Sequence, residues 1–195
     1  TLDQDSVCPQ NMIEIYSLYV SISNVGLICP FIRQRNMVNN KIEWKNHIEY
    51  IQIAISSGSL VRTEAWCDVN GFWDKLFIDR VDDDFCLALR DRGWKILQIN
   101  DVELEHEIGY PIVRNFMGKR YYTDSYPEFR YYYIARNTLL VSAYYKNLPY
   151  NSLKLLCKRL LKILLGEDGK IKKLRSFMHG SFDGLNMISK GVQRY

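Results

Sequence analysis

Apolar and polar positions follow two different spacings along the chain, and the pattern predicts strands and helices in turn. The apolar run Leu27–Ile32 is typical of a short buried strand, and Lys95–Asn100 alternates apolar with polar positions as a second strand would. From Val81 to Leu89, apolar residues recur every three to four positions, which predicts an amphipathic helix that Gly93 ends. Strands that alternate with helices favour an α/β layer fold.

Local signals predict further elements around this framework. Pro9 fits the first turn of a helix that continues through residues 12–20, and Thr63 can cap a short helix that Asn70-Gly71 ends. Pro127 opens a long aromatic helix that runs to about residue 145.

The remaining stretches give weaker patterns. Residues 33–50 are polar without a clear period, which predicts a loop. Residues 51–55 and 102–106 alternate and predict two more short strands.

Charge and cysteine content narrow the class of protein. The net charge is only +4, but acidic residues gather between Asp68 and Glu107 and basic residues gather after Lys154. This asymmetry predicts an acidic metal site and a basic tail with a different partner. The five Cys include no C-x-x-C pair, which argues against structural zinc and favours a reducing, cytoplasmic compartment. No apolar run reaches the roughly 18 residues of a membrane span.

Two carboxylates separated by one residue, Asp3 and Asp5, form a D-x-D motif near the start. Carboxylates at this spacing suit a hard divalent cation that also bridges phosphates. About one such pair is expected by chance in a chain with this much Asp, and Asp82-x-Asp84 is a second example. On the residues alone, a solvated turn is the competing interpretation.

Several motifs occur together in the order found in one enzyme family. After the D-x-D come Ser57-Gly58-Ser59 and the acidic stretch from Asp79 to Arg90, and these are followed by Leu104–Gly109, of the form L-x-H-x-x-G, and Tyr132–Asn137, of the form Y-Y-x-x-R-N. Together they resemble the family-2 glycosyltransferases, and most closely their bacterial rhamnosyltransferase-like branch. The resemblance extends from residue 2 to about residue 190.

The resemblance implies a GT-A (Rossmann-like) fold and inverting transfer of a sugar from a nucleotide-diphosphate donor, such as dTDP-rhamnose or a UDP-sugar. By analogy, Asp5 ligates a divalent metal directly, Asp3 lies nearer the ribose or the metal's waters, and His106 is a later ligand. A His among oxygen ligands fits Mn²⁺ better than Mg²⁺. The alternative for His106 is a structural residue with its hydrogen bonds satisfied.

The catalytic base implied by the resemblance is Asp82, which would take the proton of the acceptor hydroxyl. Val81 stands where the commonest form of the motif has Glu, and the alternative for Asp82 is a helix cap. Ser57 and Gly58 would approach the donor or acceptor, or form a plain turn into a strand. Arg136 would neutralise a donor phosphate, or lie on an exposed helix face.

The resemblance also sets the expected organisation. Residues 1–125 would be the C-terminal portion of a GT-A domain, with the nucleotide-binding strands before the D-x-D missing, and residues 126–195 an α-helical tail. A sheet cut in this way exposes a strand edge, which predicts a homodimer or edge pairing. The competing function is a non-catalytic binding or scaffold module that kept the fold.

The tail contains a basic amphipathic helix from Leu153 onward. The predicted apolar face carries Leu153, Leu156, Cys157, Leu160 and Leu164, and the opposite face carries Lys154, Lys158, Arg159 and Lys162. Such a helix either lies on the cytoplasmic face of the inner membrane, near a glycan or lipid-linked glycan acceptor, or packs on its own domain or a dimer mate. The chain has no recognised nucleic-acid module, so we expect no nucleic-acid partner.

Overall fold

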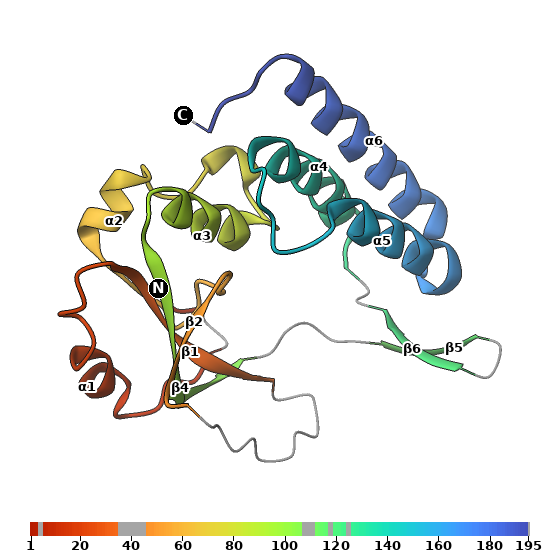
Figure 1. The fold of residues 1–195 in the computed structure, drawn as a ribbon. Helices are drawn as coiled ribbons and strands as arrows, with labels where there is room; N and C mark the ends of the chain where they lie inside the picture. Colours follow the sequence, from red (N-terminus) through yellow and green to blue (C-terminus); the bar gives the residue numbers. More distant parts are fainter. Residues whose placement is uncertain (4–5, 35–45, 107–111, 117–118, 124–125, 195) are drawn as a thin grey trace. The chain divides into compact units, whose positions relative to one another are not determined.

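The chain forms two compact units in the computed structural model, which describes residues 1–3, 6–34, 46–106, 112–116, 119–123 and 126–194 (Figure 1). The first unit comprises Thr1–Phe72 and Asp82–Ile108, and the second comprises Trp73–Val81 and Gly109–Tyr195. This division differs from the expected one, because the chain changes unit near residue 108 rather than 125 and residues 73–81 belong with the later part of the sequence.

A four-stranded mixed sheet organises the first unit. The strands lie in the order β2-β4-β1-β3, and β1 and β4 are parallel neighbours while the edge strands pair antiparallel. The helices α2 and α3 lie between β1 and β4 in the sequence, as a parallel pair requires a crossover. The predicted α/β class is therefore confirmed, and the sheet is compatible with a Rossmann-like glycosyltransferase. The bounds are β1 Val25–Gln34, β2 Ile48–Ile51, β3 Leu60–Val61, β4 Lys95–His106, α2 Thr63–Asp68 and α3 Val81–Asp91.

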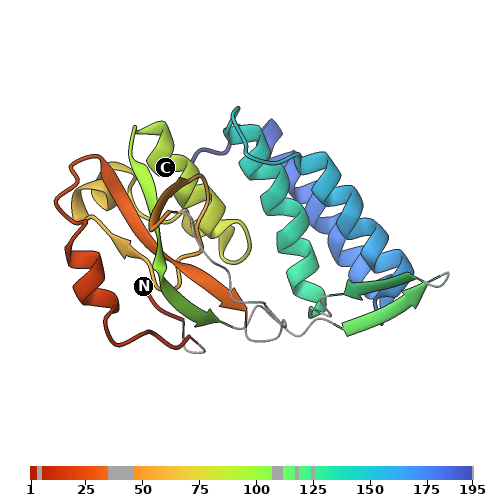
Figure 2. The ribbon, with the colours of Figure 1, turned by 60° about the horizontal axis from the view of Figure 1, so that its bottom comes forward.

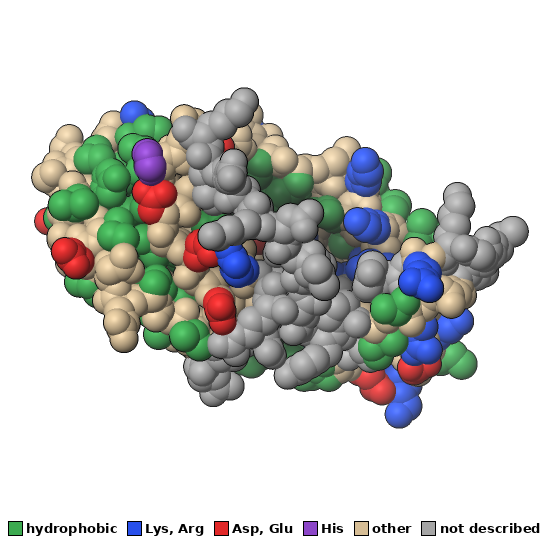
Figure 3. Space-filling model, turned by 90° about the horizontal axis from the view of Figure 1, so that it is seen from below, with side chains coloured by type: hydrophobic (Ala, Val, Ile, Leu, Met, Phe, Trp, Pro, Cys, Tyr) green, Lys and Arg blue, Asp and Glu red, His purple; other side chains and the backbone are tan. Residues whose placement is uncertain are grey.

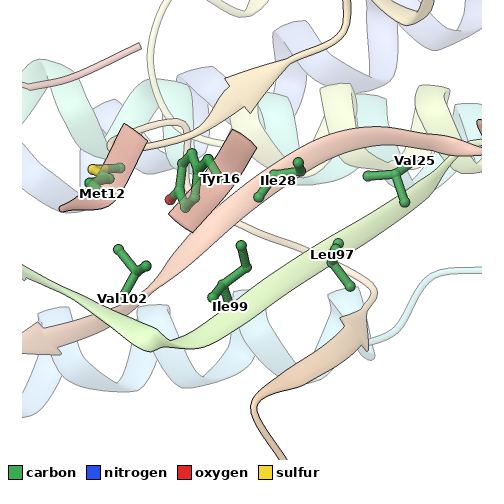
Figure 4. Close-up of a cluster of buried hydrophobic side chains, with 7 residues drawn as sticks. All are labelled: Met12, Tyr16, Val25, Ile28, Leu97, Ile99 and Val102. Carbon is green, nitrogen blue, oxygen red and sulfur yellow. The ribbon is translucent and has the colours of Figure 1, made fainter. Parts of the chain in front are cut away.

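The short helix α1, Met12–Ser17, covers the central strands β1 and β4 with apolar side chains (Figure 4). Tyr16 is buried there, and its hydroxyl donates to the carbonyl of Gly58 at 2.9 Å. Burial raises the pKa of Tyr16 above its ordinary value. This packing links the core to the Ser57-Gly58 turn. The cluster consists of Met12, Tyr16, Val25, Ile28, Leu97, Ile99 and Val102.

Several element boundaries differ from the sequence-based prediction. Helix α1 starts at Met12 rather than near Pro9. The N-cap of α2 is Arg62, which makes no side-chain capping bond, so the capping role of Thr63 is wrong. The two strands predicted at 95–100 and 102–106 form the single long strand β4. The strand predicted at 51–55 is displaced, because β2 starts at Ile48 and ends at Ile51.

Three helices and a hairpin make up most of the second unit (Figure 2). The core of this unit lies where the three helices meet, at Tyr131, Ala135, Ile163 and Phe177. No helix in the described part of the chain is long and apolar enough to cross a membrane. The bounds are β5 Ile112–Phe116, β6 Lys119–Thr123, α4 Glu128–Tyr144, α5 Ser152–Gly166 and α6 Lys170–Ser189, with a short 3-10 helix at Asp74–Leu76.

The predicted amphipathic helix is α5, and its apolar face is divided. Leu156 and Leu160 pack against the core of the second unit, whereas Leu153 and Leu164 are exposed. The side chain of Asn151 caps the helix by accepting from the backbone N–H of Lys154 at 2.8 Å. Cys157, the fifth residue of the predicted face, is also exposed, so the alternative in which this helix packs on its own domain holds for two of the five residues.

Helix α6 packs closely on α4 through two glycines spaced four residues apart. A Cβ added at Gly180 would lie 2.1 Å from the carbonyl oxygen of Tyr132, and one added at Gly184 would lie 3.1 Å from that of Arg136. Only the absence of a side chain lets the two backbones approach this closely.

Gly180→Ala should therefore lower the free energy of unfolding by about 1–3 kcal/mol, because the added methyl meets backbone that has to move. Gly184→Ala should cost less, since its closest contact is 1 Å longer. Urea unfolding followed by circular dichroism measures both, and equal stability of the Gly180 variant and the native chain would contradict the close approach.

Candidate functional site

Ser57 lies at the centre of a chain of hydrogen bonds in the first unit. Its buried hydroxyl accepts from the backbone N–H of Asp3 at 3.2 Å and lies 2.7 Å from the hydroxyl of Ser6. The Ser6 hydroxyl in turn lies 2.9 Å from Nδ1 of His106. The start of the chain, the Ser56–Ser59 turn and the end of β4 thus meet, although they are 50 to 100 residues apart in sequence.

Backbone contacts hold the first residues against this turn. The N–H of Gly58 donates to the carbonyl of Thr1, and the terminal amine of Thr1 donates to the carbonyl of Ser59, both at 2.9 Å. Gly58 has φ +74°, and a Cβ there would lie 2.8 Å from Leu104, so only glycine fits. Gly58 therefore shapes the turn into β3, which was the alternative weighed for it, and Ser57 supplies the polar group.

Asp82 lies at the start of α3 beside the same turn. Its half-buried carboxylate accepts hydrogen bonds from the side chain and the backbone of Ser56. Burial raises the pKa of Asp82, and the charges of Asp83 and Asp3 act in the same direction, whereas the Ser56 bonds lower it. The net result is that the pKa of Asp82 is raised, so this carboxyl holds its proton more strongly than an ordinary Asp.

Of the two predicted metal ligands, the structure describes His106 but not Asp5. Asp5 lies outside the described residues, and within the described part of the chain no group of three or more His, Cys, Asp and Glu side chains could hold a metal ion. The bond from Ser6 fixes the ring of His106 through Nδ1, as an outer hydrogen bond does for a His that ligates a metal. A Mn²⁺ or Mg²⁺ ion held by Asp5 and His106 therefore stays a prediction.

The contacts of Arg136 differ from both sequence-based interpretations. Arg136 is 9% exposed, so it does not lie on an exposed helix face. Its guanidinium donates to the backbone carbonyls of Lys75 and Leu76 and stacks over Tyr133, with 4.7 Å between guanidinium carbon and ring centre. These contacts stabilise the fold. We therefore do not include Arg136 among the proposed donor-binding residues.

Sequence reasoning missed two members of the site, Ser6 and Ser56. Both adjoin residues that the motifs did single out, since Ser6 follows the D-x-D and Ser56 precedes Ser57-Gly58-Ser59. A run of small hydroxyl residues at a turn is a usable signal for such a network. Which hydroxyl faces which partner depends on the turn conformation, and that is set by the fold.

The sequence of this chain is similar to that of a known rhamnosyl transferase. The chain is 26% identical over 206 aligned positions to the dTDP-rhamnosyl transferase RfbF of Shigella flexneri, and the alignment covers 97% of this chain and 69% of that protein. No protein-family model matches the sequence, and no solved structure matches the chain. The similarity indicates a glycosyltransferase.

Proposed function

We propose that this chain carries catalytic residues of an inverting glycosyltransferase that moves a sugar from a nucleotide-diphosphate donor to a glycan or lipid-linked glycan acceptor in cell-surface polysaccharide synthesis. The donor would be dTDP-rhamnose or a UDP-sugar, and the name of the similar Shigella protein favours the former. Two observations support the proposal. Hydrogen bonds connect Asp3, Ser57 and, through Ser6, His106, and Asp82 accepts hydrogen bonds from Ser56, the neighbour of Ser57.

Asp82 would act as the general base in this reaction. Its carboxylate takes the proton of the acceptor hydroxyl while that oxygen attacks the anomeric carbon, and the nucleotide diphosphate leaves on the opposite face of the sugar. The raised pKa of Asp82 makes its ionised form a stronger base than an exposed Asp. The two bonds from Ser56 orient the carboxylate before the acceptor arrives.

The start of the chain and His106 would serve the donor. A Mn²⁺ or Mg²⁺ ion held by Asp5 and His106 would neutralise charge on the donor diphosphate. Asp3, whose backbone is fixed by Ser57, would contact the ribose or the waters of the metal. We further propose a cytoplasmic location; attachment to the inner membrane face and a homodimer remain predictions.

A donor screen on the purified protein tests the proposal. UDP- and dTDP-sugars are incubated with Mn²⁺ or Mg²⁺, with and without lipid-linked acceptor, and nucleotide release is measured. We expect release from one donor class that EDTA abolishes. If no donor releases nucleotide, with or without acceptor, the result would favour the non-catalytic binding or scaffold module instead.

A further inference from the structure

The second unit contains a basic hollow of about 150 Å³ between α4 and α5. Four cationic side chains line it, and the other described lining residues are uncharged. The sequence pattern predicted that the cations of α5 would face solvent or lipid, but the structure turns three of them toward this hollow. The cations are Arg80, Lys158, Arg159 and Lys162.

Arg80 is held in place by an unusual backbone conformation. Asp79 and Arg80 have φ +63° and +65°, values that non-glycine residues adopt only under backbone strain. The amide of Asn137 fixes this turn by donating to the carbonyls of Leu76, Ile78 and Asp79 at 2.8 to 2.9 Å. The backbone strain is therefore offset by buried hydrogen bonds.

The side chain of Arg80 is also oriented before any ligand binds. Its Nε donates to the hydroxyl of Thr138 at 3.3 Å, and its guanidinium carbon lies 5.0 Å from the centre of the Tyr150 ring. A guanidinium fixed in this way loses little freedom when it contacts a phosphate.

Like charges lie close together along α5. Lys158 and Lys162 are four residues apart, a spacing at which like charges destabilise a helix. Ten Lys and Arg residues face only three Asp and Glu between residues 152 and 194. Figure 3 shows several of the Lys and Arg side chains of the second unit gathered on one face. The positive charge of this unit thus exceeds that of the whole chain, which is +4.

We infer that this hollow binds a phosphate or diphosphate group. Its volume corresponds to about five water molecules at about 30 Å³ each, which is enough for a diphosphate. Lys and Arg are the side chains that bind phosphate oxygens. The source of the group, either a nucleotide-sugar donor or a lipid-linked acceptor, rests on the proposed function, whereas phosphate binding by the hollow does not.

Calorimetric titration with inorganic pyrophosphate tests the site directly. We expect saturable binding to the native protein, and a loss of affinity of roughly tenfold or more in Lys158→Gln/Lys162→Gln, because two charged contacts are removed. The matched control is Lys154→Gln/Lys170→Gln, which removes the same charge from exposed positions at the starts of α5 and α6 and should bind almost normally. Thermal unfolding of both variants establishes that they fold.

Competition identifies the source of the group. Displacement of pyrophosphate by dTDP or UDP, but not by farnesyl diphosphate, assigns the hollow to the donor, and the reverse assigns it to a lipid-linked acceptor. The inference is overturned if millimolar pyrophosphate does not bind, or if both double variants weaken binding equally, since the effect would then be diffuse charge. Nucleotide release in the donor screen is measured separately, so failure of the proposed sugar transfer can be distinguished from failure of phosphate binding.

Discussion

Asp82→Asn should lower the turnover number by about 10²–10⁴-fold, the usual contribution of a general base. The amide keeps the size of the carboxyl and one acceptor oxygen for Ser56, but it does not take a proton at neutral pH. The measurement is initial-rate nucleotide release with saturating donor and acceptor. An unchanged turnover number would exclude Asp82 as the base.

The same substitution should raise the stability of the protein at neutral pH. Burial raises the pKa of Asp82 in the folded state, so the ionised carboxylate is less stable there than in the unfolded chain. The stability that the Asp82 carboxyl contributes is fully present below its unfolded-state pKa. This stability is lost as the pH rises through its folded-state pKa. Scanning calorimetry should therefore show a higher Tm for Asp82→Asn than for the native protein at pH 7, and a smaller difference at pH 4.

Asp83→Asn provides the matched control, because it removes a charge from the next position of the same helix. The variant should retain most of the turnover. The charge of Asp83 contributes to the raised pKa of Asp82, so the acid limb of its pH–rate profile should move to lower pH. A large loss of turnover in Asp83→Asn would assign the base role elsewhere in the acidic cluster.

Local backbone signals in the sequence were sufficient to place the ends of α2 and α3 and the start of α4. Asn70 and Gly71 end α2 with φ +53° and +67°, Gly93 with φ +84° follows α3, and Pro127 is the N-cap of α4. These residues constrain their own backbone, and that constraint can be recognised without knowledge of the fold. The hairpin of β5 and β6 and the long helix α6 were not predicted.

The site was predictable in its acidic and imidazole members but not in how they connect. Asp82 and His106 were found because their residue types carry chemistry and their order matches a known family. Ser6 and Ser56 connect them through hydroxyl groups whose direction depends on contacts between distant segments. For Arg136 the prediction was of a phosphate contact, whereas the fold provides carbonyls from residues 75 and 76, some 60 positions earlier.

Lys173→Met should lower the free energy of unfolding by about 3–5 kcal/mol, the cost of leaving a buried charge without its partner. Nζ of Lys173 lies 2.8 Å from Oε2 of Glu167, and the two side chains are 8% and 0% exposed. Glu167 is the C-cap of α5 and Lys173 lies in the first turn of α6, so each charge opposes the dipole of its own helix. Their pairing offsets both costs, and the Tyr131 ring, whose centre lies 5.3 Å from Nζ, adds a cation–π contact to Lys173.

The double variant Glu167→Gln/Lys173→Met should recover most of the loss, because no buried charge remains. Lys172→Met is the control. Lys172 is exposed, and its Nζ lies 3.6 Å from Oε1 of Glu128. This substitution should change the free energy of unfolding by less than about 1 kcal/mol. Urea unfolding at pH 7 compares the three variants with the native protein. If the single and double variants were equally unstable, lost packing rather than an uncompensated charge would explain the effect.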